Sequence, residues 1–132
     1  MKILKHIADV RKDVKKINNL GLVPTMGGLH KGHLSLIKES KKKCKKTLVT
    51  IFINPRQFNK IDDFRNYPRQ LDKDLYLLNK LKVNFVFLPN KNEIYKNNNF
   101  KKITLSKKEK ILCAKFRNGH FEGVLDIMKR FI

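Results

Sequence analysis

The sequence has few of the features that mark secreted or membrane proteins. Its two cysteines, Cys44 and Cys113, lie far apart and match no CxxC pattern, so we expect reduced thiols and no disulfide framework. Apolar runs such as Phe85–Leu88 are far too short to cross a bilayer. The amino terminus lacks the apolar core of a signal peptide, because Asp9 and Arg11 interrupt it. These absences predict a cytoplasmic protein that has no membrane partner.

Acidic residues are also scarce. The chain has 11 Asp and Glu against 31 Lys and Arg, which gives a formal net charge of +20. A nucleic-acid-binding surface usually gathers Arg and aromatic residues on one element, whereas lysine here occupies polar positions throughout the chain. The one dense cluster, Lys41–Lys46, falls where we expect a helix to end, and cations suit that end of the helix dipole. We therefore expect no specific nucleic-acid partner and only non-specific binding at low salt.

The length of 132 residues and the hydrophobic content of 41% fit one folded domain spanning residues 1–132. The apolar pattern predicts strands over 1–4, 20–24, 47–53 and 85–88. It predicts helices over 6–16 and 32–43, a third with Leu71, Leu75, Leu78 and Leu81 on one face, a short strand over 103–105, and helices over 107–116 and from 124. This alternation predicts an α/β fold with a doubly wound parallel sheet.

The stretch Leu22–His33, with the sequence LVPTMGGLHKGH, contains the main candidate site. It combines the end of a strand, a turn with two adjacent glycines and the start of a helix, where unpaired backbone N–H groups attract anions. His30 and His33 are three residues apart across the first helical turn, so both can face one phosphate. Two histidines could also begin a zinc site, but no third ligand stands nearby at a suitable spacing, and we predict no metal site.

Five segments, in this order, resemble pantoate–β-alanine ligases, also called pantothenate synthetases: LVPTMGGLHKGH, IFINPRQF, NYPRQLDKD, VFLPNKNEIY and GHFEGV. That family has a Rossmann-like fold and the HxGH signature of nucleotidyl-transfer enzymes. HxGH alone is shared with adenylyl- and cytidylyltransferases, which are the nearest alternative. The pattern PTMGxLHxGH followed by a strand that ends in NPxQF is much more specific to the ligases.

The resemblance implies an AMP-forming carbon–nitrogen ligase. The carboxylate of pantoate attacks the α-phosphate of ATP, which Mg²⁺ accompanies, and β-alanine then displaces AMP to give pantothenate. The resemblance implies catalytic roles for His33 and His30, and contacts with pantoate and β-alanine for Gln57 and Asn54. The ATP contacts that it implies are Pro24, Thr25, Met26, Gly27, Gly28, Leu29, His30, Lys31, Gly32 and His33.

Asp74 falls where some family members have an acid near the magnesium ion, although the sequence alone equally allows a surface acid on a helix. The family pattern continues beyond this chain into another strand, a second ATP contact, a mobile loop and a C-terminal domain. We therefore expect a truncated domain with an uncovered apolar helix face, including Val124 and Ile127, and little ligase activity in isolation. The alternatives are an inactive remnant and a half-enzyme that binds a separate C-terminal partner. The intact family implies a homodimer acting on small molecules.

Overall fold

The computed structural model describes residues 1–95 and 130, which belong to two compact units. The first unit comprises residues 1–53 and 68–93, and the second contains residues 54–67 together with 94, 95 and 130. The elements in chain order are β1 (Lys2–Leu4), α1 (Ile7–Val14), β2 (Leu20–Thr25), α2 (Lys31–Lys43), β3 (Lys46–Ile51), the 3₁₀ turn η1 (Pro55–Gln57), α3 (Ile61–Arg65), α4 (Leu71–Lys80), β4 (Phe85–Phe87) and α5 (Lys91–Tyr95).

The first unit is built on a parallel sheet of four strands in the order β1-β4-β3-β2. Each strand is followed by a helix or by a segment that contains one, as right-handed crossovers in parallel sheets require. The predicted α/β fold with a parallel sheet is confirmed, and the predicted strands match β1 to β4 to within two residues at each end. The sequence did not predict η1, α3 or α5.

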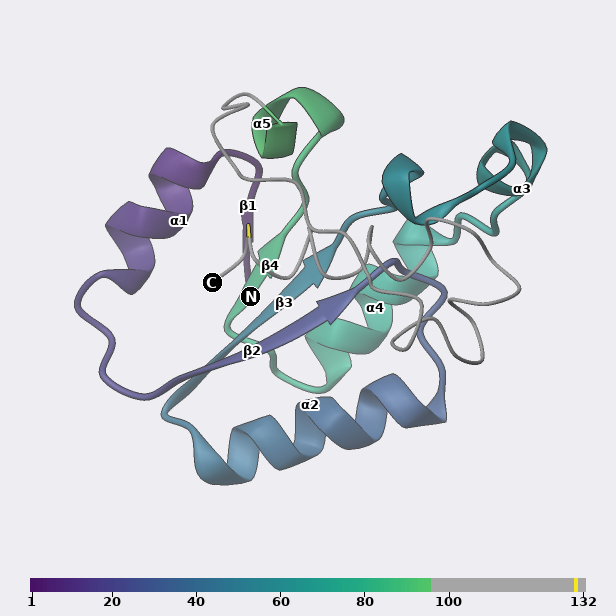
Figure 1. Ribbon diagram of the computed structural model, residues 1–132. Coiled ribbons are helices and arrows are strands. Elements are labelled where there is room, and N and C mark those ends of the chain that lie inside the picture. The colour runs from purple at the N-terminus through teal and green to yellow at the C-terminus, as the bar shows by residue number, and fades with distance from the viewer. Residues whose placement is uncertain (96–129, 131–132) are drawn as a thin grey trace, which may run out of the picture. The chain divides into compact units, whose positions relative to one another are not determined.

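One face of the sheet is covered by α2 and α4 (Figure 1). Val23, Val49 and Val86 lie side by side on β2, β3 and β4 and are at most 5% exposed. They form one hydrophobic cluster with Ile37 of α2 and Leu78 of α4, both fully buried. Burial of these side chains holds the two helices against this face of the sheet.

The apolar face predicted for α4 is only partly correct. Leu78 is buried and Leu75 and Leu81 pack against the core, but Leu71 is 45% exposed. The buried position near the start of the helix is taken instead by Asp74, one turn before Leu78. An ionised side chain at such a position needs hydrogen-bond donors around it.

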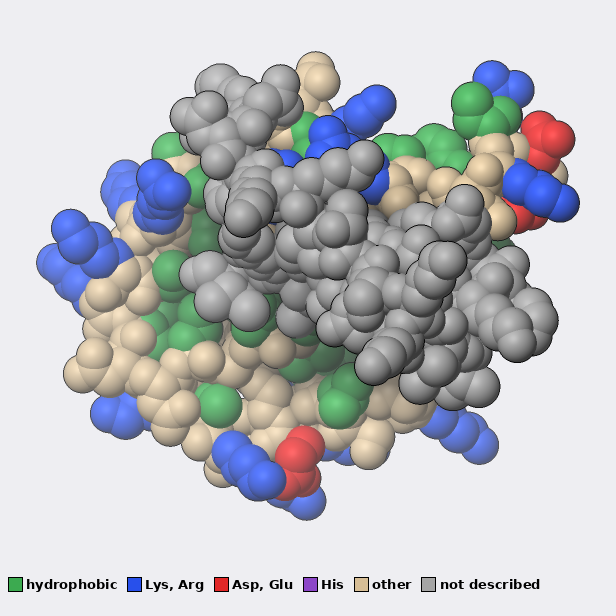
Figure 2. Space-filling model, viewed as in Figure 1, with side chains coloured by type: hydrophobic (Ala, Val, Ile, Leu, Met, Phe, Trp, Pro, Cys, Tyr) green, Lys and Arg blue, Asp and Glu red, His purple; other side chains and the backbone are tan. Residues whose placement is uncertain are grey.

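Lysines and arginines are spread over the visible surface and are not gathered in one band (Figure 2). One of them has a local role: the Nζ of Lys41, in the last turn of α2, donates to the carbonyls of Leu81 and Lys82 at the end of α4. Among the helices in the described part of the chain, none is both long and apolar enough for a bilayer crossing. The elements predicted over 103–105, 107–116 and from 124, with Cys113, Val124 and Ile127, lie outside the described residues.

Candidate functional site

The predicted glycine turn lies directly after the carboxyl end of β2. Gly27 and Gly28 have φ values of +78° and +60°, a backbone region that favours glycine. Thr25, the last residue of β2, links this turn to the neighbouring strand, because its Oγ1 donates to the Thr50 carbonyl (2.8 Å) and accepts from the Gly27 N–H (3.2 Å). The turn is therefore positioned by the strand ends, where parallel sheets hold their ligands.

Asp74 holds the next two backbone amides of the turn. Its Oδ2 accepts from the Gly28 N–H and its Oδ1 accepts from the Leu29 N–H, both at 2.9 Å. The residue is 2% exposed, so the interpretation of Asp74 as a surface acid is wrong. The cause is tertiary packing, because α4 carries this carboxylate to the turn, and no local sequence pattern records that.

His30 and His33 lie together at the start of α2, as the spacing predicts. His30 is the N-cap residue, and its Nδ1 accepts from the Gly32 N–H (3.1 Å). The Nδ1 of His33 accepts from the His30 N–H (3.3 Å), and the ring centroids are 4.0 Å apart. Both imidazoles thus act as capping side chains at the start of α2: that of His30 accepts the Gly32 N–H, and that of His33 accepts the His30 N–H.

These hydrogen bonds fix the tautomer of both rings. Because each Nδ1 accepts a backbone N–H, the proton of the neutral imidazole is on Nε2 in His30 and in His33. Within residues 1–95 and 130, neither Nε2 has a hydrogen-bond partner. The pair therefore offers two N–H donors, 4.0 Å apart between ring centroids, to an anionic ligand.

Burial lowers the pKa of His33 below its ordinary value of 6.5, and the neighbouring His30 lowers it further. The Asp74 carboxylate opposes both effects without cancelling them. The hydrogen bond from His30 points the same way, because a protonated Nδ1 could not accept it. His33 is therefore neutral at neutral pH, with an Nε2–H group that can donate a hydrogen bond.

The structure changes the expected source of anion binding at this turn. The sequence predicts that unpaired backbone N–H groups at the helix start attract the anion. Five of these amides are already paired within the chain, namely those of Gly27, Gly28, Leu29, His30 and Gly32. These five amides are therefore already used, whereas the Nε2–H groups of the two imidazoles can donate to a ligand.

The other predicted ATP-contact residues differ in exposure. Pro24 in β2 and Met26 after it are half-buried, whereas Lys31 and Gly32 are exposed in the first turn of α2. Leu29 is 9% exposed and belongs to the hydrophobic cluster. Leu29 thus anchors the turn in the core, while contact with ATP by any of these residues stays a prediction.

Asn54 and Gln57, predicted to bind pantoate and β-alanine, belong to the second unit. Asn54 is the N-cap of η1, and its Oδ1 accepts from the Arg56 N–H (3.1 Å) and from the Tyr95 hydroxyl (2.5 Å). Both Asn54 and Gln57 are buried, at 0% and 6% exposure. The substrate contacts of these two residues stay a prediction, and for Asn54 the structure shows a role in shaping the turn.

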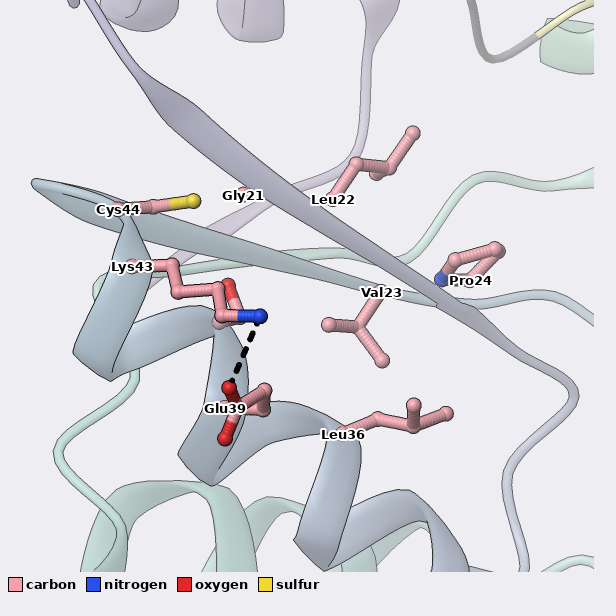
Figure 3. Close-up of a pocket in the computed structure, with 9 residues that line it drawn as sticks. Gly21, Leu22, Val23, Pro24, Leu36, Glu39, Lys43 and Cys44 are labelled. Atoms are coloured by element: carbon pink, nitrogen blue, oxygen red, sulfur yellow. Dashed lines mark ion pairs between the residues drawn. The ribbon is translucent and has the colours of Figure 1, made fainter.

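A cavity of about 320 Å³ lies elsewhere, between β2 and α2 (Figure 3). Its lining is mainly apolar, with the ion pair between Lys43 and Glu39 (3.1 Å) on one side. Of the predicted ATP-contact residues, Pro24 alone lines it. The lining residues are Gly21, Leu22, Val23, Pro24, Leu36, Glu39, Ser40, Lys43 and Cys44. The cavity therefore does not coincide with the histidine pair.

The arrangement of the turn and the histidine pair can be compared with known proteins. A family model described as pantoate-beta-alanine ligase matches residues 2–132. This chain belongs to the pantoate–β-alanine ligase family. The resemblance inferred from the motifs is thereby confirmed over nearly the full chain.

Relatives in the pantoate–β-alanine ligase family match along the whole chain. Pantothenate synthetases of Bartonella tribocorum and Pseudothermotoga lettingae are 42% and 40% identical to it, and each match covers 98% of this chain and 47% of the relative. The chain thus spans about half the length of the curated relatives that it matches.

Solved structures of the family share the fold. The pantoate-beta-alanine ligase of Francisella tularensis, solved with "Beta-gamma ATP" and β-alanine, superimposes with a TM-score of 0.93 at 37% identity, over 99% of this chain and 52% of that chain. The enzyme from Thermus thermophilus gives a TM-score of 0.90 at 31% identity, over 99% of this chain and 48% of that chain. The α/β fold of this chain is therefore that of the family.

Proposed function

We propose that this chain provides the nucleotide-binding part of an AMP-forming pantoate–β-alanine ligase. In the proposed reaction, pantoate and ATP give pantoyl adenylate and pyrophosphate, and β-alanine then displaces AMP to give pantothenate. Support comes from the family match over residues 2–132 and from a relative solved with an ATP compound and β-alanine. We also propose that residues 1–132 act as one nucleotide-binding domain and that the protein forms a homodimer, as the resemblance implies.

The single observation that carries the proposal is the histidine pair at the start of α2. Both Nδ1 atoms accept backbone N–H groups, which leaves the Nε2–H groups of His30 and His33 as the donors that we propose meet the phosphates. Attack on the α-phosphate builds negative charge on phosphoryl oxygens, and donors held in place before the reaction stabilise that charge more than they stabilise bound ATP. We assign His33 and His30 this role at the phosphates.

Magnesium enters the proposal only as a companion of ATP. Within the described part of the chain, no group of three or more His, Cys, Asp or Glu is arranged to hold a metal ion. Both carboxylate oxygens of Asp74 accept backbone N–H groups. Magnesium usually binds the phosphates of a nucleotide with only one or two protein carboxylates and several waters. The described residues therefore do not form a dedicated magnesium site, and the ion would enter with the phosphates of ATP.

Calorimetric titration of the chain with ATP tests the binding step. We expect ATP to bind the unchanged chain and to bind more weakly to His33→Ala, because one of the two Nε2 donors is lost. Ser35→Ala, an exposed position two residues further along α2, is the matched control and should bind as the unchanged chain does. The absence of any ATP binding by a folded chain would contradict the proposal.

A coupled assay for AMP formation tests the complete reaction. We expect little AMP from the chain alone, because the family relatives that it matches are about twice as long. AMP formation that requires both pantoate and β-alanine, and that His33→Ala abolishes, would instead show that these residues suffice for catalysis. Co-purification with a second polypeptide that restores activity would favour the half-enzyme alternative, and ATP consumption with a different acceptor would favour another nucleotidyltransferase.

A further inference from the structure

Asp74 is a buried acid to which the proposed reaction assigns no role. Burying a carboxylate is costly unless donors surround it, and here each oxygen receives a backbone N–H at 2.9 Å. The donors, Gly28 and Leu29, are consecutive residues of the turn, whereas Asp74 comes from α4, 46 residues after Gly28. The contact therefore joins two distant segments at one point.

Successive N–H groups of such a turn form a concavity that suits an anion. We propose that Asp74 fills this concavity permanently and so acts as a positioning residue for His30 and His33. The turn then binds a carboxylate of the protein itself, and the imidazoles are left to meet the anion of a ligand. The identification of that ligand as a nucleotide rests on the proposed function.

The link from Asp74 to the imidazoles is short and continuous. The Leu29 N–H is fixed by Asp74, and the next residue, His30, caps α2. The His30 N–H donates to Nδ1 of His33, and Nδ1 of His30 accepts from Gly32. A shift of the turn would therefore move His30, which carries one imidazole and whose N–H orients the imidazole of His33.

Gly27 shows how closely the carboxylate fits. A Cβ on Gly27 would lie 3.0 Å from Oδ2 of Asp74 and 3.2 Å from Cγ2 of Ile51. The turn and the carboxylate are thus packed without room for a methyl group between them. At Gly28, by contrast, a Cβ would meet no atom within 4 Å, so the close contact is confined to the side that faces Asp74.

The test compares Asp74→Asn with Asp72→Asn on the full chain. Both substitutions remove one negative charge from α4, but Asp72 is exposed. An asparagine at position 74 offers one oxygen and one NH₂ group, so one of the two turn amides loses its acceptor. In Asp74→Asn we expect amide exchange at Gly28 or Leu29 to be faster by about tenfold or more, since hydrogen bonds to charged groups are the stronger ones.

A spectroscopic readout separates positioning from general stability. In Asp74→Asn we expect the ring resonances of His30 and His33 to shift while those of His6, at the start of α1, stay unchanged. We also expect ATP to bind about tenfold more weakly. Asp72→Asn should leave the exchange rates, ring resonances and affinity as they are. Unchanged His30 and His33 resonances in a folded Asp74→Asn chain would overturn the inference.

Two further outcomes remain decisive. If Asp74→Asn does not fold, exchange in the unchanged chain decides: protection of the Gly28 and Leu29 amides comparable to that in β2 supports the inference, and exchange at the rate of an exposed amide overturns it. If the unchanged chain binds no ATP, the proposed function fails for this chain. The exchange rates and ring resonances then still test whether Asp74 positions the imidazoles.

Discussion

In the turns that follow β2 and β3, a buried Asp or Asn side chain accepts backbone N–H groups, but the two side chains come from different places. Asp74 reaches the first turn from α4, 46 residues after Gly28, whereas Asn54 caps its own turn through the N–H of Arg56, two residues on. The two residues are 2% and 0% exposed. The backbone N–H groups that Asp74 accepts therefore depend on the packing of α4, whereas the one that Asn54 accepts lies two residues along its own turn, and Asn54 accepts the distant Tyr95 hydroxyl as well. Substitutions should separate these two kinds of dependence.

The largest effect should come from the remote contact. Asp74→Ala leaves the buried Leu29 amide and the part-buried Gly28 amide without acceptors, and we expect the free energy of unfolding to fall by about 3 kcal/mol. Urea unfolding followed by circular dichroism measures this. Asp72→Ala, on the exposed side of α4, should change stability by no more than about 0.5 kcal/mol. Equal losses in the two variants would show that the remote contact is not a support of the fold.

A smaller effect is expected for the local cap. Asn54→Ala removes the acceptor of the Arg56 N–H and of the Tyr95 hydroxyl, so we expect a loss of about 2 kcal/mol in the free energy of unfolding. Asn59→Ala, exposed in the same segment, is the matched control and should be nearly neutral. A loss greater than that of Asp74→Ala would reverse the ranking of the two turns.

The two glycines of the first turn sharpen the comparison further. Alanine in the left-handed region costs about 1 kcal/mol, which is what we expect for Gly28→Ala because its Cβ meets open space. We expect Gly27→Ala to cost about 2 kcal/mol, because strain is joined by a close approach to Asp74. Thermal unfolding of both variants gives the difference. A Gly28→Ala chain less stable than the Gly27→Ala chain would contradict this account of the turn.

The smallest effect concerns pH, and it belongs to the first turn alone. The pKa of His33 is lowered below 6.5 in the fold, so the folded chain takes up that proton less readily than the unfolded chain. This contribution to stability is present above pH 6.5 and is lost as the pH falls through the lowered pKa. Comparing unfolding of His33→Gln with the unchanged chain at neutral and mildly acidic pH measures it. We expect the variant to lose less stability on acidification, and identical pH dependence would refute this.

The sequence predicts the sheet well because its signals are local. Each of these signals lies within a few residues of the element that it predicts. They are the β-branched run that becomes β3, the prolines Pro24 and Pro89 at the ends of apolar runs, and the spacing of Leu75 and Leu78. The short helices α3 and α5 were missed because each has only five residues, too few for a periodic pattern to show. Leu71 was placed on the buried face by spacing alone, and packing at the start of α4 decides otherwise.

For the candidate site, the sequence predicts the turn and the two adjacent histidines but not their hydrogen bonds. The spacing of His30 and His33 gives their position at the helix start, whereas the cap that Asn54 provides for η1 was not predicted. The role of Asp74 could not be predicted, because it depends on how α4 crosses the sheet. The pairing of the Gly28 and Leu29 amides follows from that contact, and the pairing of the Gly27, His30 and Gly32 amides follows from the side chains of Thr25, His33 and His30, so the sequence alone does not show that these amides are already used.

Lys41 has a structural role that the composition does not reveal. It is one of 31 basic residues, and its ammonium group connects the end of α2 to the carbonyls of Leu81 and Lys82, directly after α4. Acetylation at this side chain would release two helix-end carbonyls as well as neutralise a charge. A survey of lysine reactivity along the chain should therefore distinguish this amine, which connects two helices, from Lys43, which pairs with Glu39 on its own helix.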